Sequence, residues 1–369
     1  MARLRLALLL ALTLAMIFPL ACGGPRRVER PQAATPLAPA QAKEAWTKAE
    51  NVFASRCVVC HGCYDAPCQL KLGTFDGIDR GATSARVYDS SRLLPADPTR
   101  LDIDAHDALG WRKKGFHPVL PEGDEADPRA SLLVRMLELK RTHPLPGPDV
   151  TRDFTFELDR KETCATAEKF DDYAKEHPLW GMPYALPGIA PEEDAALVGW
   201  VNAGAPHAQP SPLAAGVVAS IEAWESFLNE PSLKGRLVAR YVYEHLFLAS
   251  LYFTDTDDRT LFRLVRSRTP GPLPVDEVAT RRPFEDPKVG RVYYRFVRRL
   301  ERPLDKTLMP YPLGAARLAH FRDLFLGRKY DVDRLPTSSR MSRPTLSKRS
   351  PRSPPTCGTG SCSRRLSSP

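Results

Sequence analysis

After its first twenty residues, the chain has no apolar run long enough to span a membrane. Residues 6–20 are almost all apolar and follow the basic residues Arg3 and Arg5. A basic start and an apolar run shorter than a typical membrane span are characteristic of an export signal. The sequence therefore predicts a signal peptide over residues 1–22 and an exported protein. Cys22 leaves two outcomes open, cleavage nearby or a lipid anchor on this cysteine.

The end of the chain lacks acidic residues. From Pro336 onward it carries seven Lys and Arg residues and no Asp or Glu, in a segment rich in Ser and Pro. The whole chain has a net charge of +9, so the rest of it is close to neutral at +2. A nearly neutral body gives no indication of a nucleic-acid partner. Because large apolar residues are few in the last segment, we expect residues 336–369 to be disordered.

Internal repeats are also absent, and the 36 prolines argue against a long regular repeat. Residues 23–41 form a linker rich in Pro and Ala. Beyond it, apolar residues recur at helical spacing in residues 42–57, 130–141 and 190–206. Helical spacing becomes more frequent after residue 210. The sequence therefore predicts a mostly α fold.

Cysteine is scarce outside one short segment. Four of the eight cysteines lie within twelve residues: Cys57, Cys60, Cys63 and Cys68. Their pattern, C-x2-C-x2-C-x4-C, differs from the iron–sulfur run, which needs a shorter last interval and a following proline. Four-cysteine zinc sites usually consist of two separated pairs. Residues 57–61 match the C-x-x-C-H pattern of covalent haem attachment, which we favour over structural disulfides alone.

Three side chains of this motif would hold a covalently attached haem c. Cys57 and Cys60 would form thioethers, and His61 would be the proximal iron ligand. Met182 is the candidate second ligand, because it begins a Met-Pro loop that is followed by a closing helix. Cytochromes c often show this order of motif, loop and helix. The first part of the chain is therefore predicted to be a cytochrome c-like haem domain with long loop insertions.

Other candidate ligands have weaker support. Met309 begins a second Met-Pro, but it lies beyond the closing helix. His245 is expected to be a core histidine in a helix. Three histidines precede prolines, where we expect turns and surface positions: His117, His143 and His177. Cys63 and Cys68 remain free to pair with each other, whereas Cys164 stands alone.

Several segments resemble bacterial fatty acid cis/trans isomerases, which are exported c-type haem enzymes. The most specific segment is CVVCHGCYDAPCQLKL at residues 57–72. Similar segments recur in order through both halves of the chain: 97–101, 111–120, 135–146, 177–188, 243–253, 262–270 and 291–295. The resemblance extends over residues 45–335. Members of the family continue beyond this point, so the chain resembles a truncated or frameshifted member.

The resemblance implies a periplasmic isomerase that converts cis-monounsaturated acyl chains of membrane lipids to trans without moving the double bond. Trans chains would stiffen the membrane under solvent stress. It further implies haem c on Cys57, Cys60 and His61, with His61 catalytic and Met182 as a second metal ligand. Expected partners are membrane phospholipids or free unsaturated fatty acids, together with the cytochrome c maturation machinery. The haem domain would occupy residues 42–210, and a helical isomerase-family region would occupy residues 211–335.

A basic segment of the second half is the candidate membrane-docking surface. Phe262 and Leu264 would enter the bilayer beside arginines that contact lipid phosphates. These arginines are Arg263, Arg266, Arg268, Arg281 and Arg282. The alternative is that they form a solvated basic face or internal ion pairs. The alternative function is an exported electron-transfer c-type cytochrome, which needs the same haem but not the region after residue 210.

Overall fold

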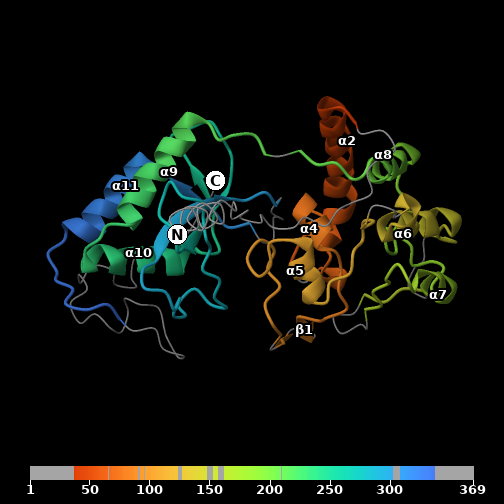
Figure 1. Cartoon of the computed structure of the whole chain (residues 1–369), viewed down its shortest axis with the longest axis horizontal. Helices are drawn as coiled ribbons and strands as arrows, with labels where there is room; N and C mark the ends of the chain where they lie inside the picture. Colours follow the sequence, from red (N-terminus) through yellow and green to blue (C-terminus); the bar gives the residue numbers. More distant parts are fainter. Residues whose placement is uncertain are drawn as a thin grey trace, which may run out of the picture.

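The computed structural model describes residues 37–336, except residues 65, 90–91, 95, 124–126, 148–152, 157–161, 209 and 302–307. The predicted signal peptide, the linker up to residue 36 and the tail from residue 337 lie outside the described residues. The described elements form two groups, which Figure 1 shows side by side.

The first half is built from short helices joined by long loops (Figure 1). Its α-helices are α2 (Pro39–Val52), α3 (Val58–His61), α4 (Phe75–Arg80), α5 (Ala108–Lys113), α6 (Leu132–Thr142), α7 (Phe170–Glu176) and α8 (Pro191–Asn202). A π-helical turn, Phe53–Cys57, joins α2 to α3. Two 3₁₀ turns are η2 (Pro67–Gln69) and η3 (Pro128–Ala130), and an antiparallel ribbon pairs β1 (Tyr88–Asp89) with β2 (Arg92–Leu93).

Helices α2 and α8 pack against each other in the core of the first half. Pro39 stands in the first turn of α2, where its missing N–H costs no helical hydrogen bond, so the helix begins inside the predicted linker. Trp200 of α8 is buried with its ring 5.6 Å from those of Trp46 and Phe53. Aromatic pairs at this spacing stabilise a core beyond the area they bury. The packing fixes the helical run that leads to the cysteine cluster.

The second half combines helices with a four-stranded mixed sheet. Its helices are α9 (Ala215–Leu228), α10 (Leu233–Leu246) and α11 (Ala315–Phe321), and α11 continues into a π-helical segment, Arg322–Gly327. The strands are β3 (Ser250–Phe253), β4 (Phe262–Ser267), β5 (Tyr293–Arg298) and β6 (Pro310–Leu313). Their order is β5-β4-β3-β6; β4 is antiparallel to β3 and β5, whereas β6 runs parallel to β3.

Alternate residues of the strands point into the apolar core of the second half. The buried residues of this pattern are Leu251, Phe253, Phe262, Leu264, Tyr294 and Phe296. Side chains of α9 and of the residue after it occupy the outer edge of β5: the backbone N–H groups of Tyr294 and Phe296 donate to Asn229 (2.9 Å) and Glu225 (2.8 Å). These bonds satisfy backbone groups that a free strand edge would leave unpaired.

The predicted mostly α, cytochrome c-like fold is wrong. The sheet lies in residues 250–313, within the region that was expected to be helical, and the fold mixes α and β structure. The strands are four to six residues long, and on such a short run helical and strand spacing are hard to distinguish.

Polar contacts join the two halves. Lys71 forms an ion pair with Glu301, and Arg100 donates to the carbonyl of Thr280 at 2.8 Å. Buried apolar side chains form one cluster within residues 46–205 and another within residues 217–318. The domain boundary at residue 210 stays a prediction. No helix among the described residues is both long and apolar enough to cross a membrane.

Candidate functional site

The motif of residues 57–61 lies on one nearly continuous helical run. Cys57 ends the π-helical turn, and Cys60 and His61 end α3. Residues three and four positions apart share a helix face, so both thiols and the imidazole lie close together. Cys60 is exposed and Cys57 is half-buried; both are free thiols. The structure therefore places the three predicted haem-binding residues on one short segment.

An ion pair to α8 holds the residue that precedes this motif in place. Arg56 donates to the carboxylate of Glu193 at 2.8 Å. The same carboxylate accepts the N–H of Ala190 at 2.9 Å, which caps the start of α8. Burial raises the pKa of the Cys57 thiol to about 12, with smaller contributions from Cys60 and Glu193. Cys57 is therefore a protonated thiol at neutral pH in the haem-free chain.

His61 is buried, and a backbone carbonyl orients its ring. The Nδ1 atom lies 3.1 Å from the carbonyl oxygen of Leu70, which accepts its proton in the neutral tautomer. Desolvation lowers the pKa of His61, so the neutral form is favoured. In that tautomer Nε2 carries the lone pair that a metal would need. Histidines that bind metals usually donate their other ring N–H to such a carbonyl, so His61 fits the predicted role.

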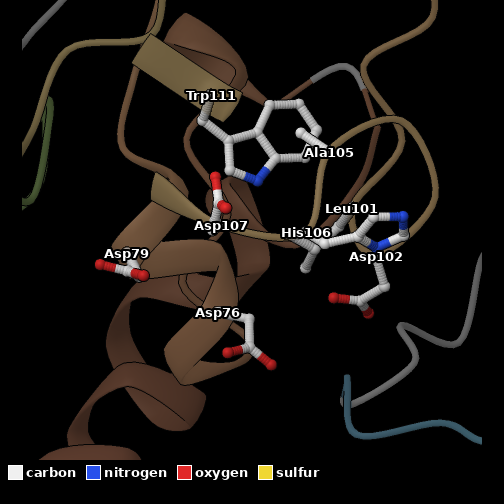
Figure 2. Close-up of a pocket in the computed structure, with 8 residues that line it drawn as sticks. All are labelled: Asp76, Asp79, Leu101, Asp102, Ala105, His106, Asp107 and Trp111. Atoms are coloured by element: carbon white, nitrogen blue, oxygen red, sulfur yellow. The ribbon is translucent and has the colours of Figure 1, made fainter. Parts of the chain in front are cut away.

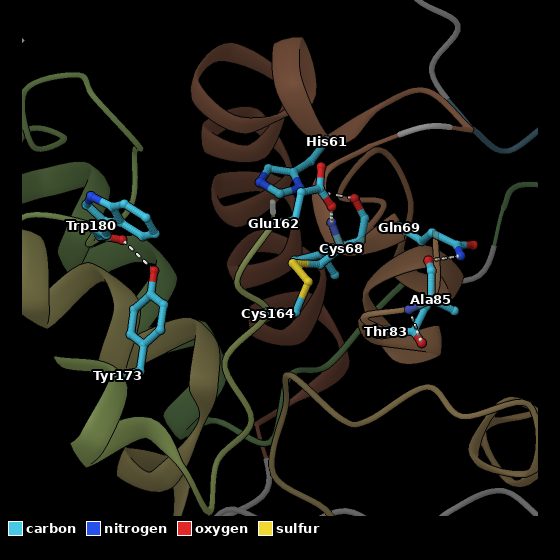
Figure 3. The surroundings of a disulfide bond; sticks show 10 residues. His61, Cys68, Gln69, Thr83, Ala85, Glu162, Cys164, Tyr173 and Trp180 are labelled. Carbon is cyan, nitrogen blue, oxygen red and sulfur yellow. Dashed lines mark hydrogen bonds between the residues drawn. A yellow bond between two sulfur atoms is a disulfide. The ribbon is translucent and has the colours of Figure 1, made fainter. Parts of the chain in front are cut away.

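The loop that supplies this carbonyl is tightly anchored (Figure 3). Cys68 and Gln69 have positive φ angles of 54° and 49°, which side chains rarely favour. The Gln69 side chain donates to the carbonyl of Ala85 at 2.7 Å and accepts from the Thr99 hydroxyl at 2.6 Å. The anchored loop holds the Leu70 carbonyl in place for His61.

Arg80 is the central support of this loop. It is 1% exposed and donates to the carbonyls of Gln69 and, at 2.9 Å, Thr99. Its guanidinium carbon lies 5.4 Å from the ring of Trp111 and 4.9 Å from that of Phe116. Burial lowers its pKa to about 10, and Nε has no hydrogen-bond partner. Sequence reasoning missed this residue.

A disulfide closes the other side of the loop. Cys68 bonds to Cys164, with the Cα atoms 5.7 Å apart, so the pairing with Cys63 that the sequence left open does not form (Figure 3). The backbone N–H of Cys68 donates to Glu162 at 3.0 Å. Cys68, Glu162 and Cys164 have ligand atoms within 4.8 Å of one another. Among the described residues, no other group of three side chains that could bind a metal is this compact. Because both sulfurs are bonded to each other, this group does not offer thiolates to a metal.

Met182 lies in the loop between α7 and α8, and this loop is anchored on α6. Its backbone N–H donates to the carbonyl of Met136 at 3.0 Å, and its side chain is half-buried. A Cβ on Gly181 would lie 2.2 Å from the backbone nitrogen of Lys140, so only glycine permits this approach. The contacts hold the Met182 backbone at a fixed place.

The other candidate ligands contact neighbouring protein groups or are exposed to solvent. His177 stacks on Trp180 with centroids 3.9 Å apart, and the backbone of His117 pairs with Ala82. His143 is exposed and contacts the Thr142 hydroxyl. Met309 is exposed and directly precedes β6. His245 is exposed, so its expected core position is wrong; its Nδ1 lies 2.8 Å from the carbonyl of Tyr241.

The structure favours internal partners for these arginines over the candidate membrane-docking surface. Phe262 and Leu264 are buried in β4. Four of the five arginines have protein partners: Arg263 pairs with Glu277, Arg266 donates to the carbonyl of Glu285, Arg268 pairs with Asp276 and Arg281 donates to the carbonyl of Ala96. The alternating pattern of a half-buried strand explains why basic and apolar residues lie side by side here.

An acidic pocket of about 150 Å³ lies beside α4 and α5 (Figure 2). Asp79 and Asp102 lie on opposite sides of the view, and Asp107 accepts the N–H of Gly110 at 2.6 Å as the cap of α5. The carboxylates do not converge closely enough to form a metal-binding group. Asp107 has a structural role, and we assign no site to this pocket.

The sequence matches the family model of fatty acid cis/trans isomerases over residues 96–345. The match covers more than half of the chain and defines an isomerase that acts on fatty acids. The chain belongs to the fatty acid cis/trans isomerase family. The C-x-x-C-H motif at residues 57–61 lies before the matched segment. No curated protein and no solved structure matches the chain.

Proposed function

We propose that this isomerase uses a covalently bound haem c to convert cis-monounsaturated acyl chains of membrane lipids to their trans isomers. The observation that carries the proposal is the His61 ring, buried on the motif with Nδ1 directed at the Leu70 carbonyl. Cys57 and Cys60 supply the thioether sulfurs, and Met182 is the proposed second iron ligand. The free state of both thiols is consistent with haem attachment.

In this reaction the side chains of the protein would position the cofactor and would not transfer protons. When bound, haem would supply an oxidised iron that withdraws electron density from a nearby C=C bond and eases rotation about it. Rotation in place neither adds nor removes a proton at carbon, so no acid or base side chain is required. His61 presents a neutral Nε2, and Arg80 and the disulfide keep its acceptor loop rigid. The anchored loop of residues 177–188 keeps Met182 at a fixed place.

The proposed setting is the periplasm, where the cytochrome c maturation machinery attaches the haem. Trans chains pack more tightly than cis chains, so the product would stiffen the membrane under solvent stress. The family match supports the fatty-acid chemistry, and the motif supports the cofactor.

The test is gas chromatography of membrane fatty acids from a host that makes only cis chains and matures c-type cytochromes. The host would express the wild type, His61→Ala or the matched control Cys63→Ser. We expect trans acids with the wild type and Cys63→Ser and none with His61→Ala. Equal trans acids with His61→Ala would contradict the haem mechanism. A haem-loaded chain that makes no trans acids would favour an electron-transfer cytochrome.

A further inference from the structure

The disulfide belongs to a compact group of three side chains that can bind a metal (Figure 3). Ligand atoms of Cys68, Glu162 and Cys164 lie within 4.8 Å of one another. In a tetrahedral zinc site, with Zn–S bonds of about 2.3 Å and Zn–O bonds of about 2.0–2.2 Å, neighbouring ligand atoms are roughly 3.5–3.8 Å apart. Small side-chain rotations would therefore bring these three ligands to a zinc ion, once the two sulfurs are no longer bonded to each other.

Contacts other than the disulfide hold the backbone on both sides of this group. The carbonyl of Cys68 accepts the N–H of Thr83 at 2.9 Å, and its N–H donates to the Glu162 carboxylate at 3.0 Å. On the other side, Ala165 directly follows Cys164 and is buried in the apolar core of the first half. The Cα atoms of the two cysteines are 5.7 Å apart. We therefore expect both thiols to stay close together when the disulfide is reduced.

Reduction changes what this group can bind. A dithiol reductant would give two electrons and two protons to the disulfide and would itself become a disulfide, which leaves thiols on Cys68 and Cys164. A zinc ion would then displace the two thiol protons, because the thiolate is the form of cysteine that binds metals. Thiolate and carboxylate are both usual zinc ligands, and water would complete the tetrahedron.

We propose that the reduced chain binds one zinc ion through the Sγ atoms of Cys68 and Cys164 and the carboxylate of Glu162. The metal would replace the disulfide as the link between the loop after the motif and the loop before α7. It would thereby keep the Leu70 carbonyl in place for His61 under reducing conditions. The site goes beyond the isomerase function and is independent of haem, because none of its ligands belongs to the motif of residues 57–61.

Alkylation of the full, haem-loaded chain tests which thiols bind the metal. The chain is treated with a dithiol reductant, the reductant is removed, and the cysteines are alkylated with and without one equivalent of zinc. We expect zinc to abolish labelling of Cys68 and Cys164 and to leave Cys63, the internal control, fully labelled. Mass spectrometry of the peptides measures this. Equal labelling of Cys68 and Cys164 with and without zinc would overturn the site.

X-ray absorption at the zinc edge identifies the ligand atoms in the same reduced, zinc-loaded chain. The proposed site predicts two sulfurs at about 2.3 Å and oxygens at about 2.0–2.2 Å. A zinc ion with no sulfur ligand, or with four, would contradict it. The chain that keeps its disulfide is the matched control and should bind no zinc through sulfur.

A variant of the third ligand keeps both cysteines and therefore also the disulfide. Glu162→Gln retains an oxygen that can accept the N–H of Cys68. We expect it to weaken zinc binding about tenfold or more, since even the outer contacts of metal ligands are worth about 10–100-fold in affinity. The exposed Glu168→Gln is the matched control and should bind zinc like the wild type. Competition with a zinc chelator measures both affinities, circular dichroism checks folding, and equal affinities would refute the role of Glu162.

Discussion

His61 combines three properties that a haem ligand needs. Its ring is buried, its pKa is lowered by desolvation, and Nδ1 has a carbonyl acceptor at 3.1 Å. A surface histidine would have water on both nitrogens. Here the acceptor is part of the loop that Arg80 and Cys68 anchor, so the ring orientation depends on residues outside the motif.

The chemical state of each cysteine can be tested by peptide mapping of the haem-loaded protein. Trypsin cleaves after Arg56 and Lys71, so one peptide carries Cys57, Cys60, Cys63 and Cys68. We expect haem on Cys57 and Cys60, a disulfide from Cys68 to the Cys164 peptide, and alkylation at Cys63 alone. Mass spectrometry without reduction checks this. Alkylation of Cys57 or Cys60 would contradict haem attachment.

Arg80 should contribute strongly to stability. Arg80→Met leaves the carbonyls of Gln69 and Thr99 without their donor, and an unsatisfied buried polar group costs about 1–3 kcal/mol. The relief of a buried charge offsets part of this, so we expect a loss of about 2 kcal/mol in the free energy of unfolding. Urea denaturation measures it, with the exposed Arg129→Met as control. Equal unfolding midpoints for the two variants would contradict the role of Arg80.

At the scale of elements, the disulfide links the loop that follows the motif of residues 57–61 to the loop before α7. It joins cysteines 96 residues apart, and removing a bridge of this kind typically costs about 2–5 kcal/mol. We expect the double variant Cys68→Ser, Cys164→Ser to lose stability in this range in urea denaturation. Cys63→Ser, which breaks no bond, is the matched control. Loss of stability with Cys63→Ser alone would indicate a different pairing.

The elements that could be predicted from the sequence are those set by local pattern. The motif of residues 57–61, the helix before it and α8 depend on neighbours three or four residues away, and the structure contains them. Arg80 and Cys164 could not be found in this way, because their partners lie far along the chain and arginine is seldom buried. Strand β5 lies in the region of residues 211–335 that was expected to be helical, because a run of six residues does not separate strand spacing from helical spacing.

At the scale of the whole molecule, the second half directly contacts the loop that follows the motif of residues 57–61. Lys71 follows Leu70, whose carbonyl orients His61, and its ammonium pairs with Glu301 at the end of β5. The pair is only 11% and 24% exposed in its side chains, so solvent screens it weakly. The second half of the chain therefore supports the proposed cofactor site.

Breaking this contact should cost more than breaking a surface pair. Glu301→Gln leaves Lys71 without its anion, and we expect a loss of about 1–3 kcal/mol in the free energy of unfolding. The matched control Asp276→Asn breaks the exposed pair with Arg268 and should cost at most about 1 kcal/mol. Chemical denaturation compares them. Equal losses would mean that the pair between the halves is as weak as a surface pair.

The central claim is rotation about the double bond in place, dependent on His61. The most direct measurement incubates the purified haem-loaded protein with palmitoleic acid in heavy water and analyses the product by gas chromatography and mass spectrometry. The account predicts the trans isomer with the double bond in its original position, no deuterium on the neighbouring carbons, and no product with His61→Ala. Deuterium in the product, a shifted double bond or full activity of His61→Ala would contradict it.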